Sequence, residues 1–227
     1  MALGPFQVAN KLNQAKHIRG VALLMRHGET AWNREGRVMG RQPVDLDEIG
    51  RAQVARSVPL ARILAPDLIV CSPLARARQS AEIIADGIGG VAVIEDAGLE
   101  EVRYGEWETK TYHQLIEDPF YLNYRKAPIT TPTPGGETIP QVQERGVAAV
   151  TRALGSNRGK RVLFVSHGDI IRAVLCHYMK LELRYFHRIR IDNATFFGVE
   201  IADDFAEMKF ANLMPDPGLA FKSPFPK

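Results

Sequence analysis

Cysteine is scarce in this chain. Only Cys71 and Cys176 occur among the 227 residues, and both stand in apolar surroundings. This placement is typical of buried free thiols, whereas a small disulfide-stabilised domain carries several pairs. Two cysteines are also too few for a structural zinc site, and no His-x-x-x-His pair offers a catalytic one. We therefore expect neither a metal nor a cofactor.

Long hydrophobic runs and a strong charge of one sign are missing as well. No apolar run approaches membrane-spanning length, and residues 1–20 lack the apolar core of a signal peptide. The formal net charge is only +3, with no long basic run, so nothing favours a nucleic-acid partner. We expect a cytoplasmic protein that binds neither membrane nor nucleic acid.

Apolar runs typical of buried strands alternate with amphipathic stretches typical of helices. The expected strands are residues 21–25, 68–71, 91–94, 161–166, 194–201 and 206–213. The main expected helices are residues 48–65, with a kink or fresh start at Pro59, 73–85 with Ser72 as its cap, 139 to about 154 after Glu137-Thr138, and 169–179. This alternation predicts an α/β three-layer sandwich with a mostly parallel central sheet.

The chain divides into three parts by composition. Residues 1–18 are polar and weakly patterned, as in an N-terminal arm, and residues 214–227 form a proline-rich C-terminal tail. Between them, residues 19–213 are expected to form a single α/β domain. Residues 105–137 are rich in tyrosine, proline and charge, with at most two short helices, which predicts a small lid over the sheet edge.

The triplet Arg26-His27-Gly28 stands where the first apolar strand ends. Ligands of parallel α/β sheets bind beyond the carboxyl ends of the strands. An adjacent guanidinium disfavours the imidazolium and so keeps a ring nitrogen of His27 free to attack. Alone, the triplet is equally compatible with a polar strand end. The arrangement recurs, however, at Ser166-His167-Gly168, where an apolar helix follows and its N-terminus suits an anion.

A third strand end, Cys71-Ser72-Pro73, brings Arg76 to the same edge one turn into the next helix. A lone arginine there is usually a solvated helix residue. Together, two histidines and two arginines at one edge predict a pocket for a tetrahedral dianion, because guanidinium forks match phosphate oxygens.

These motifs resemble those of the histidine phosphatase superfamily, with its phosphoglycerate mutase-like fold. They are Arg26-His27-Gly28-Glu29-Thr30 with Trp32-Asn33, Ser72-Pro73-Leu74-Ala75-Arg76-Ala77, Leu99-Glu100-Glu101 with Gly105 and Trp107, Pro134-Gly135-Gly136-Glu137-Thr138, and Ser166-His167-Gly168. The resemblance runs from about residue 21 to 195, in the family's order. Ser80 and Thr109 depart from it, since many relatives have threonine and glycine there.

The resemblance implies a role for each matching residue. His27 would attack phosphorus and become phosphohistidine, while Arg26, Arg76 and His167 would bind the phosphoryl oxygens. Asn33 would add a side-chain N–H to the same phosphate. Glu101 matches the family's acid, which protonates the leaving oxygen and then activates water.

Further residues are expected around the substrate. Thr30, Gly168 and Arg37 complete the expected binding site, and specificity is expected in the lid and around Arg37 and Arg41. Glu100 is the neighbour that competes with Glu101 for the acid's role. His113 and the group Arg184, His187, Arg188 and Arg190 are interpreted as solvated rather than functional, and His177 as a helix-face residue.

The expected activity is that of a metal-independent phosphomonoesterase on a small phosphorylated metabolite. The interval from Glu101 to His167 is short and its lid offers only Arg125 and Lys126 as a cationic pair, whereas mutases of the family carry a longer, arginine-rich insertion. A cofactor-dependent phosphoglycerate mutase and a non-catalytic phosphate-binding regulatory module are the alternatives. The expected partner is a small phosphomonoester, with a homodimer as an open possibility.

Overall fold

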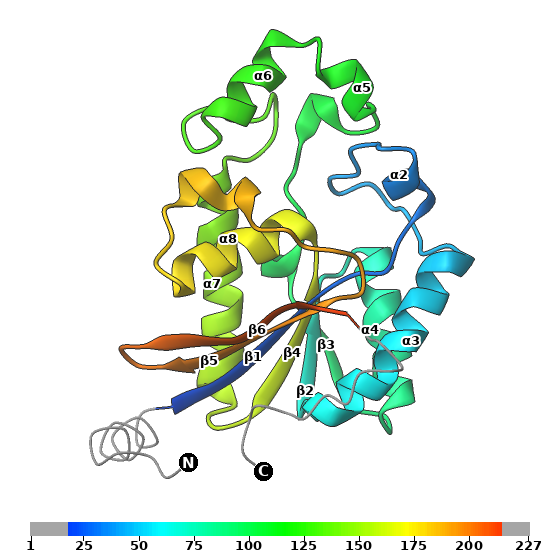
Figure 1. The fold of residues 1–227 in the computed structure, drawn as a ribbon, viewed down its shortest axis with the longest axis vertical. Helices are drawn as coiled ribbons and strands as arrows, with labels where there is room; N and C mark the ends of the chain where they lie inside the picture. The colour runs from blue at the N-terminus through cyan, green and yellow to red at the C-terminus, as the bar shows by residue number, and fades with distance from the viewer. Residues whose placement is uncertain (1–17, 215–227) are drawn as a thin grey trace.

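The computed structural model of the protein describes residues 18–214. Its centre is a six-stranded sheet with helices on both faces, and Figure 1 shows α7 and α8 on one side of it and α3 and α4 on the other. Of the expected arm only Ile18 is described, as the first residue of β1. Of the expected tail only Met214 is described; the rest of both segments lies outside the described residues.

The sheet has the strand order β3-β2-β4-β1-β5-β6. The strands are β1 (Ile18–Arg26), β2 (Leu68–Cys71), β3 (Val93–Glu95), β4 (Arg161–Ser166), β5 (Phe196–Ala202) and β6 (Ala206–Leu213). The first four strands in this order pair in parallel, and β5 and β6 are antiparallel. The predicted mostly parallel α/β sandwich is therefore confirmed.

Both faces of the sheet are buried, because successive side chains of a strand point to opposite sides. Leu23 and Met25 of β1 pack into the core on the α3 and α4 side, while Ala22 and Leu24 pack into the core on the α7 and α8 side. Continuous apolar runs, rather than alternating ones, are what such a doubly covered sheet requires. Cys71 and Cys176 lie in these cores as free thiols, as predicted.

Helices connect and cover the strands. The long ones are α3 (Glu48–Leu64), α4 (Ala75–Gly87), α7 (Ile139–Ser156) and α8 (Gly168–Tyr178); the short ones are α2 (Ala31–Arg34), α5 (Tyr112–Leu115) and α6 (Pro119–Lys126). Three 3-10 segments complete the set, namely η1 (Ala97–Leu99), η2 (Gly105–Trp107) and η3 (Leu183–Arg188). The expected fresh start at Pro59 is not found, because α3 is one element with Pro59 inside it.

Residues 105–137 rise above the sheet edge and carry α5 and α6, as Figure 1 shows. Their base is closed by hydrogen bonds from the N–H of Glu106 to the Pro134 carbonyl (3.0 Å) and from that of Glu137 to the Arg103 carbonyl (2.9 Å). Gly105 has a φ of 59° and packs where a Cβ would strike the Pro134 backbone, so glycine is required there. Within residues 18–214, no helix combines the length and apolar character needed to cross a membrane.

Candidate active site

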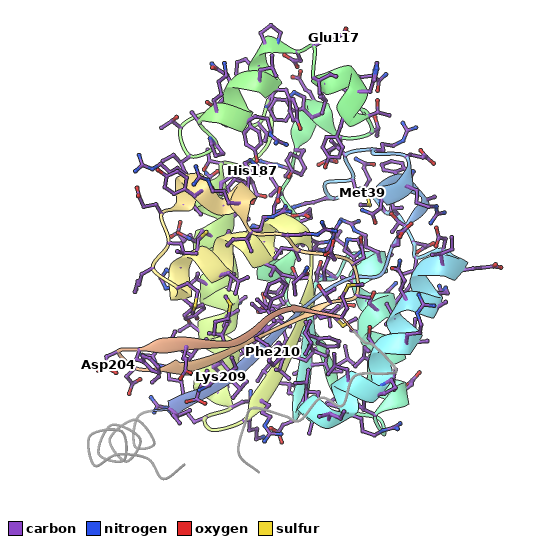
Figure 2. All side chains as sticks on the ribbon, in the orientation of Figure 1. Met39, Glu117, His187, Asp204, Lys209 and Phe210 are labelled. Atoms are coloured by element: carbon purple, nitrogen blue, oxygen red, sulfur yellow. The ribbon has the colours of Figure 1, made fainter. Side chains whose placement is uncertain are left out.

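A cavity of about 430 Å³ lies between the lid and the carboxyl end of β1. This volume is within the range of small-molecule sites. Most of the residues expected at the site line the cavity: Arg26, His27, Asn33, Arg37, Arg76, Glu101 and Gly168. In Figure 2, Met39 and His187, which also line it, are labelled on either side of the molecule beneath the lid.

The ring of His27 is oriented by the backbone next to it. Its Nδ1 lies 2.6 Å from the carbonyl oxygen of Gly28, an acceptor, so Nδ1 carries the proton and Nε2 has the free lone pair. The pKa of His27 lies well below its ordinary value, because the ring is buried and because Arg76 and Arg26 are close. The result is a neutral imidazole with its unprotonated nitrogen available as a nucleophile.

Two buried guanidinium groups stand beside this ring. Arg76 donates to the carbonyl oxygens of Gly40 (2.8 Å) and Gln42 (3.2 Å), and Arg26 donates to that of Ile191 (2.8 Å). The Nε atoms of both arginines are buried and have no hydrogen-bond partner in the described part of the chain. Burial lowers the pKa of both groups, that of Arg76 to about 10. A guanidinium group nevertheless stays charged in proteins. Buried cations with unused donors are suited to an anion.

His167 is fully buried next to His27 and does not itself line the cavity. Its Nε2 lies 2.8 Å from the hydroxyl oxygen of Ser72, which also accepts from the N–H of Leu74 (3.3 Å). In the tautomer in which Ser72 donates its proton to Nε2, Nδ1 is the protonated nitrogen of His167. That Nδ1 has no partner within residues 18–214. In that tautomer, Nδ1 is a donor that a bound oxyanion could accept from.

This contact also explains an incorrect prediction. Ser72 does not cap α4, which begins at Ala75 with Leu74 as an N-cap that makes no side-chain hydrogen bond. The hydroxyl group expected to cap the helix is engaged instead by His167, a residue far away in the sequence.

The two adjacent carboxyl groups of Glu100 and Glu101 have different surroundings. Glu101 lines the cavity, whereas Glu100 forms an ion pair with Arg41 at 3.0 Å. Burial raises the pKa of Glu101, and the nearby carboxylate of Asp169 raises it further, against the opposing effects of the Val102 N–H, Arg76 and Arg26. The protonated form of this cavity carboxyl group is thus stabilised relative to a solvated glutamate, even without a bound phosphate.

Asn33 and Thr30 act together at the start of α2. The Oδ1 of Asn33 accepts from the N–H (3.0 Å) and hydroxyl (3.1 Å) of Thr30, which leaves its NH₂ group for the cavity. Thr30 is fully buried and does not line the cavity, so its contact with the site is through Asn33. Arg41 does not line it either, because it pairs with Glu100 and with Glu137 (3.1 Å). Arg37 lines the cavity while donating to the Thr109 carbonyl at 2.7 Å.

Several lining residues were not expected from the sequence. Asp169 accepts hydrogen bonds from Tyr104 and Arg172, and all three line the cavity. Asp169 stands directly after Gly168 in the first turn of α8, and that position was the signal that could have identified it. The lid adds Tyr112, Tyr121, Tyr124 and Arg125.

The expectation that His187 is solvated is wrong. Its ring lines the cavity and contacts those of Tyr124 and Phe186, with centroids 6.0 and 3.9 Å away. The reason is η3, a segment not anticipated from the sequence, which carries His187 under the lid. Arg184 and Arg188 flank the ring of Tyr185 instead, and Arg190 pairs with Asp192 at 2.8 Å.

Comparison with known proteins accounts for this arrangement. The family model of the histidine phosphatase superfamily (branch 1) matches residues 22–213. The chain belongs to the histidine phosphatase superfamily. An acid phosphatase of Mycobacterium tuberculosis is 36% identical to this chain over 177 residues, covering 76% of this chain and 82% of the relative. A probable phosphoglycerate mutase GpmB of Klebsiella pneumoniae is 34% identical over 181 residues, covering 78% and 83%.

Solved structures of the superfamily share the fold. YhfR of Bacillus stearothermophilus aligns with a TM-score of 0.80 at 25% identity, covering 86% of this chain and 98% of that one. A mycobacterial glucosyl-3-phosphoglycerate phosphatase complexed with VO3 aligns with a TM-score of 0.75 at 25% identity, covering 86% and 99%. The relatives thus include proteins named as phosphatases and as mutases, and the phosphatase names support a phosphoric monoester hydrolase.

Proposed function

We propose that this member of the histidine phosphatase superfamily is a metal-independent phosphomonoesterase that acts on a small phosphorylated metabolite through a phosphohistidine at His27. The observation that carries the proposal is the pairing of a neutral, buried His27, whose Nε2 is free, with the unused buried Nε donors of Arg26 and Arg76. The proposed nucleophile, His27, thus lies beside two guanidinium groups suited to bind the phosphate dianion.

In the first step, Nε2 of His27 attacks phosphorus and the bond from phosphorus to the ester oxygen breaks. Arg26, Arg76 and Nδ1 of His167 hold the phosphoryl oxygens as charge shifts in the transition state. Glu101 donates its proton to the departing alkoxide oxygen, which leaves as an alcohol. The products of this step are phosphohistidine and an ionised Glu101.

In the second step, a water molecule takes the place of the alcohol. Glu101 removes a proton from this water as its oxygen attacks phosphorus, and the bond from phosphorus to Nε2 breaks. Inorganic phosphate and protonated Glu101 result, so both groups return to their starting states. The raised pKa of Glu101 supports its proposed roles as the acid of the first step and the base of the second.

A phosphoglycerate mutase remains the second candidate, because relatives are named as probable mutases. The two activities differ in whether water or a second phosphorylated hydroxy acid dephosphorylates His27. The short interval between Glu101 and His167 supports water, as do the relatives named as phosphatases.

The test is release of inorganic phosphate from a set of simple phosphomonoesters. We expect turnover by the wild-type protein, loss of at least about 10³-fold in His27→Ala, and ³²P bound to protein that is absent from this variant. His113→Ala, a matched control at an exposed lid histidine, keeps full activity. Interconversion of phosphoglycerates without net phosphate release favours the mutase. Saturable phosphate binding with no labelled protein favours a non-catalytic module.

A further inference from the structure

The backbone that follows the proposed nucleophile is held by side chains from two different helices. The N–H of Gly28 donates to the hydroxyl oxygen of Ser80 on α4 at 3.1 Å. The N–H of Glu29 donates to the side-chain oxygen of Gln53 on α3 at 2.9 Å. Between these two N–H groups in the chain stands the carbonyl of Gly28, whose oxygen is the acceptor for Nδ1 of His27. The acceptor that orients the His27 ring is therefore fixed from both sides.

Residue 28 has little conformational restraint of its own. A Cβ at this position would lie 2.6 Å from the carbonyl oxygen of Gly50 and 2.7 Å from a methyl group of Val54, so the close approach of α3 requires glycine. Glycine lacks the Cβ that limits φ and ψ in other residues. The direction of the Gly28 carbonyl therefore depends on the partners of the neighbouring N–H groups, which are Ser80 and Gln53.

The hydroxyl group of Ser80 is committed to two backbone partners. It donates to the carbonyl oxygen of Arg76, one turn earlier on α4, at 2.7 Å, and it accepts from Gly28. A hydroxyl has one proton, which goes to the carbonyl, so a lone pair of its oxygen faces the Gly28 N–H. Ser80 is fully buried, and loss of its hydroxyl would leave that N–H without this partner. Ser80 thus connects the backbone of Arg76 to the residue next to His27.

Gln53 binds the second N–H group with a two-point contact. Its side-chain oxygen accepts from the Glu29 N–H, and its NH₂ group donates to the Glu29 carboxylate at 2.9 Å. The peptide group that Gln53 binds is the one whose carbonyl oxygen lies beside Nδ1 of His27. Because a peptide group is planar, a fixed N–H also fixes the direction of its C=O.

Neither Ser80 nor Gln53 lines the cavity, so neither is placed to act by touching the substrate. We propose that both are positioning residues: by holding the two N–H groups, they aim the intervening carbonyl at Nδ1 of His27, so that Nε2 stays unprotonated and available to phosphorus. This inference rests on the proposed function and deepens it. It assigns a role in the reaction to two side chains that make no contact with the reacting atoms.

The test replaces each side chain and follows the nucleophile itself. In Ser80→Ala and Gln53→Ala we expect kcat to fall by about tenfold with little change in KM, because the His27 ring loses its fixed orientation while the phosphate ligands remain. Nitrogen-15 NMR of the free proteins reports the tautomer, with the His27 signals assigned by their absence from His27→Ala. The wild-type ring should show a protonated Nδ1 and an unprotonated Nε2, and both variants a mixture of tautomers.

Two further variants separate positioning from a general loss of stability. Ser80→Thr keeps the hydroxyl, and it should retain the wild-type rate and the single tautomer. Gln143→Ala is the matched control for Gln53, because Gln143 is a partly buried glutamine on α7 that binds a backbone group of α8, the Ala173 carbonyl, at 2.8 Å. This control should leave kcat and the His27 tautomer unchanged.

The outcomes distinguish this inference from the proposed function. A single His27 tautomer in Ser80→Ala or in Gln53→Ala overturns the role of the residue replaced, as does a rate loss confined to KM. A Ser80→Thr variant that behaves like Ser80→Ala also overturns the role of Ser80. Gln53 is only partly buried, so its replacement tests the inference independently of how Ser80→Ala folds. Absence of phosphate release from every ester by the wild-type protein, with no label on His27, overturns the proposed function instead.

Discussion

The imidazole rings of His27 and His167 lie with their centroids 5.2 Å apart and their planes inclined by 58°. Burial lowers the pKa of each ring well below its ordinary value, and the charge of Arg76 lowers both further. The positive charge of this end of the cavity therefore comes from guanidinium groups. The two histidines are left neutral, as the proposed mechanism requires of a ring that attacks and a ring that donates a hydrogen bond.

Both rings should remain neutral in mildly acidic solution. An unperturbed histidine is protonated as the pH falls through about 6.5. Since burial and the arginines depress the pKa of His27 and His167, their ring signals in an NMR titration of the free protein should not change across that range. Titration of either ring near the ordinary value would contradict the neutral pair.

Replacement of Asp169 by Asn should shift the alkaline side of the rate profile. In the proposed mechanism Glu101 must be protonated to assist departure of the alcohol, and the charge of Asp169 raises its pKa. The variant should lower the pKa of Glu101, and kcat/KM should then begin to fall at a lower pH than in the wild-type protein. An unmoved alkaline limb would show that Asp169 has no such influence.

Asp169→Asn also removes the ion pair between Asp169 and Arg172. The unpaired charge of Arg172 could then lower the pKa of Glu101 and cause the same shift. The double variant Asp169→Asn/Arg172→Gln distinguishes the two causes. If the charge of Asp169 itself raises the pKa of Glu101, the alkaline fall in kcat/KM stays at the lower pH in the double variant. If the unpaired guanidinium is responsible, the fall returns to the wild-type pH.

Arg145 should be essential for holding the proposed acid in place. Its guanidinium donates to the carbonyl oxygens of Gly98 (2.9 Å), Glu100 (2.6 Å) and Glu101 (3.0 Å), and both oxygens of Glu137 bind it in turn. Arg145→Lys keeps the charge but cannot reproduce this fork. We expect a loss of roughly 2 kcal/mol in the free energy of unfolding and about tenfold in kcat.

Urea denaturation and steady-state kinetics measure these two losses. The matched control is Arg152→Lys on the same helix, whose ion pair with Asp96 is largely exposed on the arginine side. That pair should contribute less than about 1 kcal/mol. If Arg145→Lys and Arg152→Lys lower the free energy of unfolding and kcat by the same amounts, Arg145 has no particular role in positioning Glu101.

Thr109→Gly should stabilise the protein slightly. Thr109 has a φ of 73°, in the left-handed region that a β-branched residue adopts at a cost of roughly 1–2 kcal/mol. Glycine relieves this strain but loses about 0.5–1 kcal/mol of chain entropy on folding. The net gain should be visible as a higher Tm, with Thr109→Ala giving a smaller gain. A lower Tm for the glycine variant would mean that the threonine side chain makes a compensating contact.

Local patterns were enough to predict much of the fold and the phosphate end of the site. The apolar run before Arg26-His27-Gly28 predicted a buried strand with functional residues at its end, and parallel pairing of β1 with β4 brings His27 and His167 together. Arg76 could be anticipated because it stands one turn after a strand end. These inferences needed only strand direction and spacing.

Contacts between distant segments could not be predicted in this way. Ser72 reads locally as a helix cap, yet its hydroxyl binds a histidine that follows β4. Arg41 was expected near the substrate, but Glu100 and Glu137 hold it elsewhere. The position of His187 depends on how η3 returns beneath the lid, which no periodicity in its own segment encodes.

The way in which the lid joins the sheet edge separates the choice of substrate from the proposed reaction at His27. The proposed nucleophile His27 follows a strand that is hydrogen-bonded on both sides, to β4 and to β5. The lid, which we expect to select the alcohol, enters and leaves through one narrow neck at Gly105 and Pro134. Grafting a foreign segment between these two residues should therefore redirect substrate choice while the reaction centre stays intact. The lid can therefore be exchanged as a unit while the strands that carry His27 and His167 stay unchanged, which would allow phosphatases with new substrates to be engineered.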